Sequence, residues 1–123
     1  MVILRMAEIT LIDALTSTQV LVEAERNLTS KVPEALTMFR LLTERTLQVV
    51  PPPSRDVLER HRGMAHPKDL PVLVAALTEG CPWLITFNVK HFEPGHPDVN
   101  VARPGTYLQR VRALLTHLSP RPR

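Results

Sequence analysis

The chain has 123 residues, of which 44% are hydrophobic and 22% charged, and its formal net charge at pH 7 is +3. This length suits one domain, and the apolar fraction excludes a disordered chain. No apolar stretch approaches the roughly 20 residues that cross a bilayer, and the N-terminus lacks signal-peptide features, so we expect a cytoplasmic protein without a membrane partner. The positive charge favours a polyanionic partner.

The first half of the chain predicts helices alternating with short strands. Ser17 and Thr18 are residue types that cap a helix, and Pro33 suits the first turn of another helix. Apolar side chains recur at helical spacing in three segments, and two runs of β type follow the first and the third of them. The expected helices cover residues 2–12, 18–28 and 33–46, and the expected strands cover 12–16 and 47–50.

The second half continues this alternation around a strongly apolar segment. Residues 51–66 are polar and basic, and we expect a short helix or a loop there. A helix that starts at Pro67 and is closed by Gly80 is apolar almost all round, as a centrally buried helix requires. The run from Trp83 to Phe87 is typical of a strand with both faces covered. A weaker strand and an amphipathic helix follow it, over residues 99–102 and 107–118.

Strands that alternate with helices over short connections predict an α/β domain with a mainly parallel sheet. We expect a single domain over residues 1–118 and a basic, flexible tail over 119–123, where two prolines exclude a helix. The chain carries no glycine-rich phosphate loop, no Cys/His zinc spacing and no Gly-x-Ser-x-Gly motif. The single cysteine, Cys81, has no paired base, which predicts an unreactive loop thiol.

Polar side chains near the carboxyl ends of the expected strands form a candidate site. In a parallel sheet, ligands bind where the loops and helix starts beyond these ends meet. Asp69 opens the buried helix, Asn88 follows the strand that ends at Phe87, and Glu23 lies early in the helix after the first strand. Their oxygen atoms are of the kind that Mg²⁺ and Mn²⁺ prefer, and a metal ion held there could promote phosphodiester hydrolysis.

Each of these residues also has a structural interpretation. Glu23 can be a solvated helix residue with Arg26 as an ion-pair partner one turn later. Asp69 suits a helix N-terminus through the helix dipole, and Asn88 suits a turn or a helix cap. His91 can contact phosphate or serve as a structural loop residue. The other histidines of this region have no partner at metal-binding spacing: His61, His66 and His96.

The chain contains the segments VLVEAERNL, KDLPVLVAAL and LITFNVKHF. Together they resemble the PIN-domain family, metal-dependent ribonucleases that include the VapC-type toxins of bacterial toxin–antitoxin pairs. The resemblance covers nearly the whole chain and implies a three-layer α/β/α fold. It implies Glu23, Asp69 and Asn88 as metal ligands and catalytic residues, with Thr86 as a further catalytic-site residue, and Glu25 as a neighbour that can be confused with Glu23. It also implies Mg²⁺ or Mn²⁺ as cofactor, RNA as substrate and an antitoxin protein as partner.

The chain departs from this family at its N-terminus. Family members begin with an apolar strand that ends in Asp and forms the middle of the sheet, whereas Met1 here falls inside the helix that would follow that strand. Asp13 lies after this helix and does not replace the missing ligand. Two carboxylates then remain at the cleft, so metal affinity is expected to fall. The alternative is a catalytically inactive PIN-like module that binds nucleic acid or protein.

A missing first central strand would also affect assembly, because its neighbours would expose rows of backbone donors and acceptors. We therefore expect the flanking strands to pair directly, or another chain to fill the space. The second case predicts a homodimer or a higher oligomer. A phosphatase-like metal hydrolase that uses the same carboxylates is a further alternative to the ribonuclease.

Overall fold

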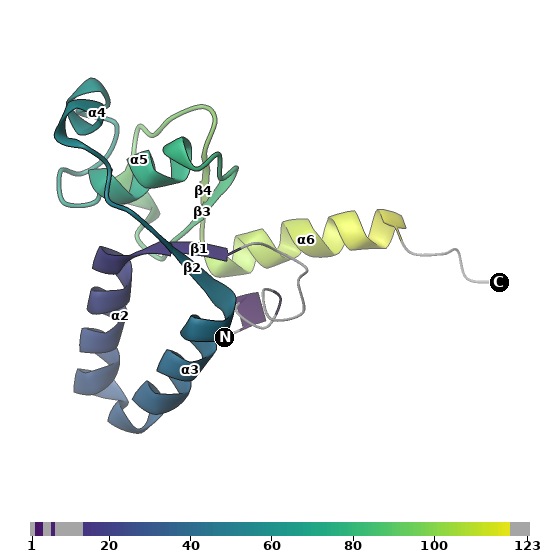
Figure 1. Cartoon of the computed structure of the whole chain (residues 1–123). Coiled ribbons are helices and arrows are strands. Elements are labelled where there is room, and N and C mark those ends of the chain that lie inside the picture. The colour runs from purple at the N-terminus through teal and green to yellow at the C-terminus, as the bar shows by residue number, and fades with distance from the viewer. Residues whose placement is uncertain (1, 4–5, 7–13, 119–123) are drawn as a thin grey trace. The chain divides into compact units, whose positions relative to one another are not determined.

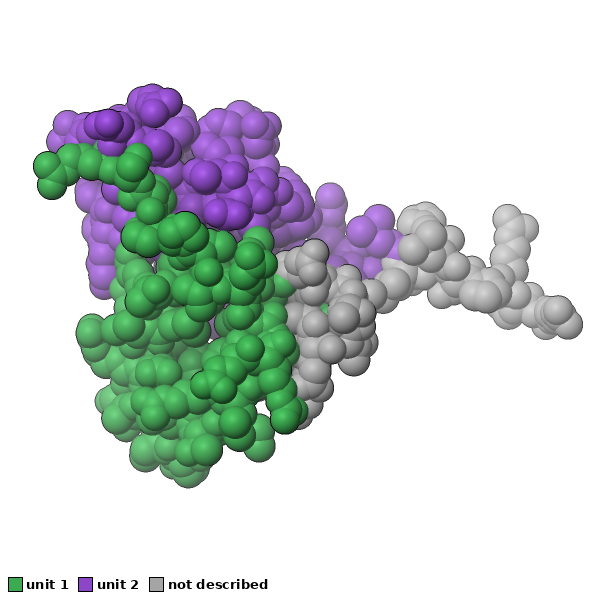
Figure 2. Space-filling model, in the orientation of Figure 1, with its two compact units in different colours: residues 1–55 green, residues 56–123 purple. Residues whose placement is uncertain are grey.

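The computed structural model of the chain describes residues 2–3, 6 and 14–118. Most of the helix expected over residues 2–12, Asp13 and the tail expected over 119–123 lie outside the described residues. The chain divides into two compact units, residues 1–55 and 56–123, which Figure 2 shows in green and purple. The single domain expected over residues 1–118 stays a prediction.

The first unit contains a pair of parallel strands with a helical connection between them. β1 (Ala14–Ser17) pairs with β2 (Leu47–Val50) along its whole length. Parallel strands need a long crossover, and helices supply it here. This crossover forms a helical hairpin (Figure 1) that consists of α2 (Thr18–Lys31), the short 3-10 helix η1 (Pro33–Ala35) and α3 (Leu36–Thr46).

A side-chain cap sets the start of α2, as the sequence predicts. Oγ of Ser17 accepts a hydrogen bond from the N–H of Val20 at 3.2 Å, which satisfies one of the free donors of the first turn. The helix continues to Lys31, beyond the expected end at Leu28. The helix extends this far because the N–H of Val32, the residue after Lys31, still donates to the carbonyl oxygen of Leu28 at 2.8 Å.

The second unit contains another parallel strand pair and an apolar helix. β3 (Trp83–Ile85) pairs with β4 (Asn100–Ala102). The chain is thus a protein of mixed helix and strand with short parallel sheets, in agreement with the expected α/β class. The helices of this part are α4 (Arg55–Arg60), α5 (Leu70–Thr78), the 3-10 helix η2 (Val89–Phe92) and α6 (Pro104–Leu118).

The two strand pairs form separate two-stranded sheets in the part of the chain that is described. Each strand pairs with the strand next to it along the chain, β1 with β2 and β3 with β4. Direct pairing of the strands that flank a missing central strand would join the two units, and it stays a prediction. Completion of the space by another chain stays a prediction.

The core of the second unit is built around α5. Leu73 and Val74 are 1% and 0% exposed. Leu84 of β3 and Phe92 of η2 belong to the same buried cluster, and the loop residue Val99 completes it on the side of β4. The apolar character of α5 on nearly all sides matches this position, because each side of the helix needs apolar neighbours. The predicted central burial of this segment is confirmed.

Helix α5 begins later, and β3 ends earlier, than the sequence predicts. The expected helix starts at Pro67, but the N–H groups of Asp69 and Leu70 both donate to the carbonyl oxygen of His66 at 2.8 Å. These two bonds form a turn before the helix. β3 ends before Phe87, because the chain turns directly after the strand.

The last helix, α6, begins against β3 and extends outward from the strand pair (Figure 1). The ring of Tyr107 meets the ring of Trp83 edge-on, with 5.5 Å between their centroids. The Arg110 guanidinium lies 5.9 Å from the centroid of the same Trp83 ring. Both contacts favour attachment of α6 to β3. None of the helices in the described ranges combines the length and the apolar character that crossing a bilayer requires.

Substitution of Leu73 by Ala should destabilise the second unit by about 2–5 kcal/mol, because it leaves a cavity in a fully packed site. Trp83 is the single tryptophan of the chain, so its fluorescence during urea denaturation reports on this unit. Leu114→Ala is the matched control: it removes the same atoms at a position that is 65% exposed. The control should change the unfolding free energy by less than about 0.5 kcal/mol. Equal effects of the two substitutions would contradict a core centred on α5.

Candidate functional site

A carboxylate–imidazole pair forms the centre of the candidate site in the second unit. Asp69 directly precedes α5, and its Oδ2 lies 3.1 Å from Nδ1 of His91 in η2. Because a carboxylate only accepts hydrogen bonds, Nδ1 of His91 is the donor. The Asp69 side chain is 18% exposed and that of His91 is 53% exposed, so the carboxylate is the more covered partner.

Backbone hydrogen bonds hold the segments that carry this pair. The N–H of His66 donates to the carbonyl oxygen of His91 at 2.7 Å, and the N–H of His91 donates to that of Asn88 at 3.0 Å. The imidazole rings of His66 and His91 lie 5.6 Å apart between centroids. The turn before α5 and the loop after β3 therefore lie side by side, although many residues separate them in the sequence.

A side-chain hydrogen bond shapes the loop after β3. Oγ1 of Thr86 accepts the N–H of Asn88 at 3.0 Å, and the N–H of Thr86 donates to the carbonyl oxygen of Ala102 at 2.9 Å. The turn is thus anchored on β4, and Asn88 is held at the start of η2. Phe87 lies between these two residues and is 75% exposed.

Neither Asp69 nor Asn88 caps its helix with its side chain. Both occupy N-cap positions, Asp69 for α5 and Asn88 for η2, but neither forms a side-chain cap hydrogen bond. The cap interpretation of Asn88 therefore has no side-chain hydrogen bond to support it, whereas the helix-dipole interpretation of Asp69 requires none. The Asp69 carboxylate bonds to His91 instead, and Asn88 is exposed and accessible to a ligand.

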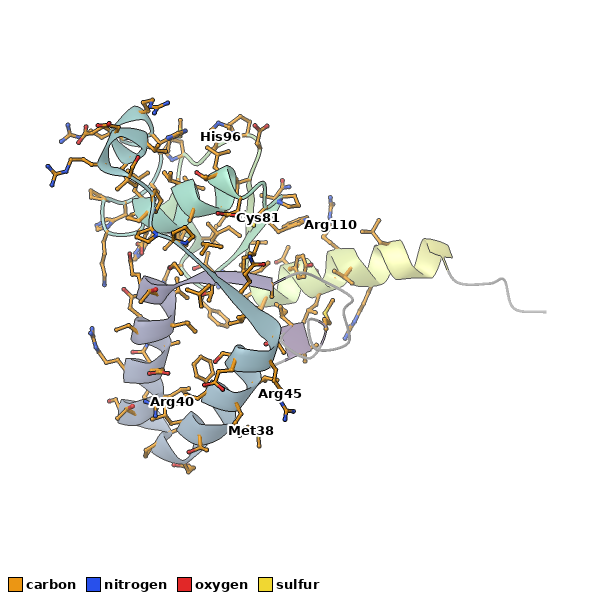
Figure 3. All side chains as sticks on the ribbon, in the orientation of Figure 1. Met38, Arg40, Arg45, Cys81, His96 and Arg110 are labelled. Carbon is orange, nitrogen blue, oxygen red and sulfur yellow. The ribbon has the colours of Figure 1, made fainter. Side chains whose placement is uncertain are left out.

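The other predicted ligand, Glu23, lies on α2 in the first unit. Its neighbour Glu25 is bound by Arg40 of α3, with 3.1 Å between Oε1 and Nε and 3.4 Å between Oε2 and Nη2. This contact gives Glu25 a structural role between α2 and α3, and Figure 3 labels the Arg40 side chain on α3. Convergence of Glu23 with Asp69 and Asn88 would span both units and stays a prediction.

Two side chains of the candidate site in the second unit carry oxygen atoms of the type that binds divalent cations. Asp69 offers a carboxylate and Asn88 an amide, and Mg²⁺ commonly takes one or two carboxylates together with water and substrate phosphate. Within the described ranges, however, no group of three or more His, Cys, Asp or Glu side chains is placed to hold a metal ion. A cation at this position would therefore depend on few protein ligands and on its substrate.

Comparisons of the chain with protein-family models, with curated proteins and with solved structures found no match. The candidate site is thus defined by the geometry of its own residues. The resemblance to PIN domains is an expectation from the sequence.

The role of His91 is the part of the site that the sequence did not predict. The sequence leaves this residue open between a phosphate contact and a structural loop position, whereas the structure pairs it with Asp69. His66, which has no partner at metal-binding spacing, lies next to the His91 ring. A signal was present, because His66 directly precedes the predicted helix and His91 lies in the loop after the predicted strand.

The single cysteine lies outside this site. Cys81 is half-buried in the loop between α5 and β3 (Figure 3). Burial raises the pKa of its thiol above the ordinary value of 9.0, and the negative charge of Glu79 raises it further. The thiolate is the nucleophilic form, so the thiol is unreactive near neutral pH. This agrees with the prediction of an unreactive loop thiol.

We expect alkylation of Cys81 by iodoacetamide to be slow at pH 7 and to accelerate with pH through a midpoint above 9.0. Glu79→Gln removes a negative charge that disfavours the thiolate, so it should lower this midpoint while burial keeps it raised. Intact-protein mass spectrometry measures the rate at the one cysteine of the chain. Rapid alkylation at neutral pH would contradict the assignment.

Proposed function

We propose that the chain is a PIN-like, metal-dependent endoribonuclease, with Glu23, Asp69 and Asn88 as ligands of Mg²⁺ or Mn²⁺ and Thr86 as support for Asn88. The fold behind this proposal is a three-layer α/β/α domain that lacks its first central strand. A role as the toxin of a toxin–antitoxin pair in the cytoplasm, as a homodimer or higher oligomer with an antitoxin partner, extends the same proposal.

The strand pairing supports this fold. A parallel sheet from which the central strand is removed leaves two parallel pairs, and the described chain has the pairs β1–β2 and β3–β4. The succession of helices and strands also follows the order that the sequence predicts.

The observation that carries the proposal is the contact between Asp69 and His91. It holds a partly covered carboxylate close to the carboxyl end of β3, which is the end where parallel sheets bind ligands. A hydrogen bond to a ligating group orients that group and is a common feature of metal sites. With Oδ2 bonded to His91, the Oδ1 atom of Asp69 is the oxygen that would bind the cation.

The residues of the site have separate roles in this proposal. A bound Mg²⁺ or Mn²⁺ would supply positive charge that polarises the phosphodiester and lowers the pKa of the attacking water. His91 orients the Asp69 carboxylate, and Thr86 fixes the backbone of Asn88. The Asn88 amide oxygen then acts as a ligand or positions the water.

The alternative function is a catalytically inactive PIN-like module that binds nucleic acid or protein. One observation favours it, because the described residues provide no group of three or more acidic, histidine or cysteine side chains for a metal ion.

Incubation of labelled RNA with the protein tests the two functions, in EDTA and with added Mg²⁺ or Mn²⁺. Cleavage should require the metal, and Asp69→Asn should slow it by about 100-fold or more, since even outer partners of metal ligands contribute 10–100-fold. The matched control is Asp98→Asn, at an exposed carboxylate of the same unit whose side chain is 79% exposed. Cleavage that survives Asp69→Asn would exclude this site, and absence of cleavage throughout would favour the binding module.

A second pair of variants tests the ligand in the first unit. Glu23→Gln should strongly reduce metal-dependent cleavage, because it removes one of the two carboxylates of the proposed site. Glu25→Gln should leave the cleavage rate near that of the unchanged protein, because Glu25 contacts Arg40 and has no proposed role in catalysis. The reverse order of effects would move the ligand from Glu23 to Glu25.

A further inference from the structure

We propose that two copies of this chain form a symmetric dimer in which the α3 helices pack antiparallel to one another. Each copy contributes four exposed residues along one side of η1 and α3, which we call the α3 stripe: Glu34, Met38, Leu41 and Arg45. The inference assigns a surface to the homodimer that the proposed function includes, and it rests on no part of the ribonuclease chemistry.

One side of α3 is covered and the other is open to solvent. Leu42 and Thr43 are its buried residues, whereas Met38 and Leu41 are 61% and 49% exposed. Figure 3 shows Met38 and Arg45 on the side of α3 that faces away from α2. Two exposed apolar side chains on adjoining turns form a patch that burial against another helix would stabilise.

The spacing of the α3 stripe is that of a helix-pairing surface. Its residues follow one another at intervals of four, three and four positions. Because an α-helix has 3.6 residues per turn, such positions lie in one row along the helix. The backbones of Ala35 and Leu36 are right-handed helical where η1 passes into α3, so Glu34 begins this row. Alternating intervals of four and three are the pattern by which helices pack in coiled coils.

The order of residues in the α3 stripe is complementary to itself. Antiparallel pairing that places Met38 of one copy opposite Leu41 of the second copy also places Glu34 opposite Arg45. Two-fold symmetry repeats both contacts, so one surface supplies all of them. Parallel pairing would instead oppose identical charges at both ends of the stripe, which is unfavourable. The sequence of the stripe therefore selects an antiparallel dimer.

The charged ends of the stripe are available for contacts between copies. Both Glu34 and Arg45 are exposed, and neither side chain has a hydrogen-bond or ion-pair partner among the residues that the structure describes. Glu25 and Arg40, by contrast, contact each other within the hairpin. Charge pairs at the rim of an interface set its register and orientation more than its affinity. This role falls to the pairs of Glu34 with Arg45, while the two apolar residues of the stripe supply the burial.

A second copy fits this surface better than an unrelated protein does. Another protein would have to present the same stripe in reverse order, whereas a second copy presents it by identity. The stripe spans about 16 Å at the helical rise of 1.5 Å per residue, so the contact lies at the small end of specific interfaces. The dimer should therefore be weak and should form reversibly as the protein concentration rises.

Sedimentation velocity of the full chain over a wide range of protein concentrations measures this association. Leu41→Lys should raise the dimer dissociation constant by about tenfold or more, because it replaces the apolar contact by a charge in both copies. Leu114→Lys is the matched control, since it makes the same change at an exposed apolar position of the second unit. The control should leave association unchanged. Circular dichroism of both variants should match that of the unchanged protein, because both positions are exposed.

Charge reversal tests the antiparallel register. Arg45→Glu and Glu34→Lys should each weaken the dimer about tenfold or more, because each turns both charge pairs of the symmetric dimer into like charges. The double variant should regain the affinity of the unchanged protein, since both pairs again join opposite charges. An equal mixture of the two single variants should also associate, because each copy then supplies the charge that the other requires. Glu93→Lys, at an exposed position of the second unit, controls for the change in net charge.

The outcomes separate this inference from the ribonuclease proposal. A monomer at every concentration overturns the dimer, and a dimer that is insensitive to Leu41→Lys and to both charge reversals overturns the α3 contact. Failure of the double variant to regain affinity overturns the antiparallel register. Association through the α3 stripe in a protein that cleaves no RNA supports the inference and rejects catalysis. Metal-dependent cleavage by a protein that stays monomeric supports the ribonuclease and rejects the inference.

Discussion

The packing of α5 against its neighbours is the interaction on which the second unit depends. Leu73 and Val74 are almost completely buried, and Leu84 and Phe92 pack in the same cluster. Because α5 is apolar on nearly every side, strand, loop and 3-10 helix must all lie around it. This requirement sets the start of α5 next to the loop that follows β3, and thereby places the Asp69 carboxylate beside η2.

The polar contacts of the candidate site refine an arrangement that the core has already set. The pair of Asp69 and His91 lies at the surface, where an ion pair contributes little to stability. Its value is positional, because it fixes the orientation of the Asp69 carboxylate against the His91 imidazole. Thr86 acts in a comparable way on the backbone of Asn88. Both contacts fix orientation at the end of β3, where the proposed chemistry would take place.

The sequence predicts well those elements that are marked by local signals. β2 has the predicted bounds because prolines follow it directly, and Ser17 caps α2 as expected. The ends of two elements were predicted less well, because short-range hydrogen bonds form turns there. The carbonyl oxygen of His66 accepts the N–H groups of Asp69 and Leu70 before α5, and Oγ1 of Thr86 accepts the N–H of Asn88 after β3. The pairing of β1 with β2 and of β3 with β4 depends on long-range contacts that no local pattern reports.

The sequence predicts the positions of the candidate-site residues but not their side-chain contacts. The positions of Asp69 and Asn88 at element ends follow from the apolar pattern between them. Their side-chain partners do not, because the contact of Asp69 with His91 joins two segments that only the folded chain brings together. The role of Glu25 in binding Arg40 also required the helical hairpin to be known.

The two units differ in how their helices are covered. α2 has no buried residue, and apolar side chains of the hairpin remain exposed, including Val22, Met38 (Figure 3) and Leu41. By contrast, α5 is enclosed by the described core. Backbone amide protons exchange with deuterium from solvent once their hydrogen bonds open, and enclosed segments open least often. The amide protons of α5 would thus exchange late and those of α2 early, so the helical hairpin would open at a lower energetic cost than α5.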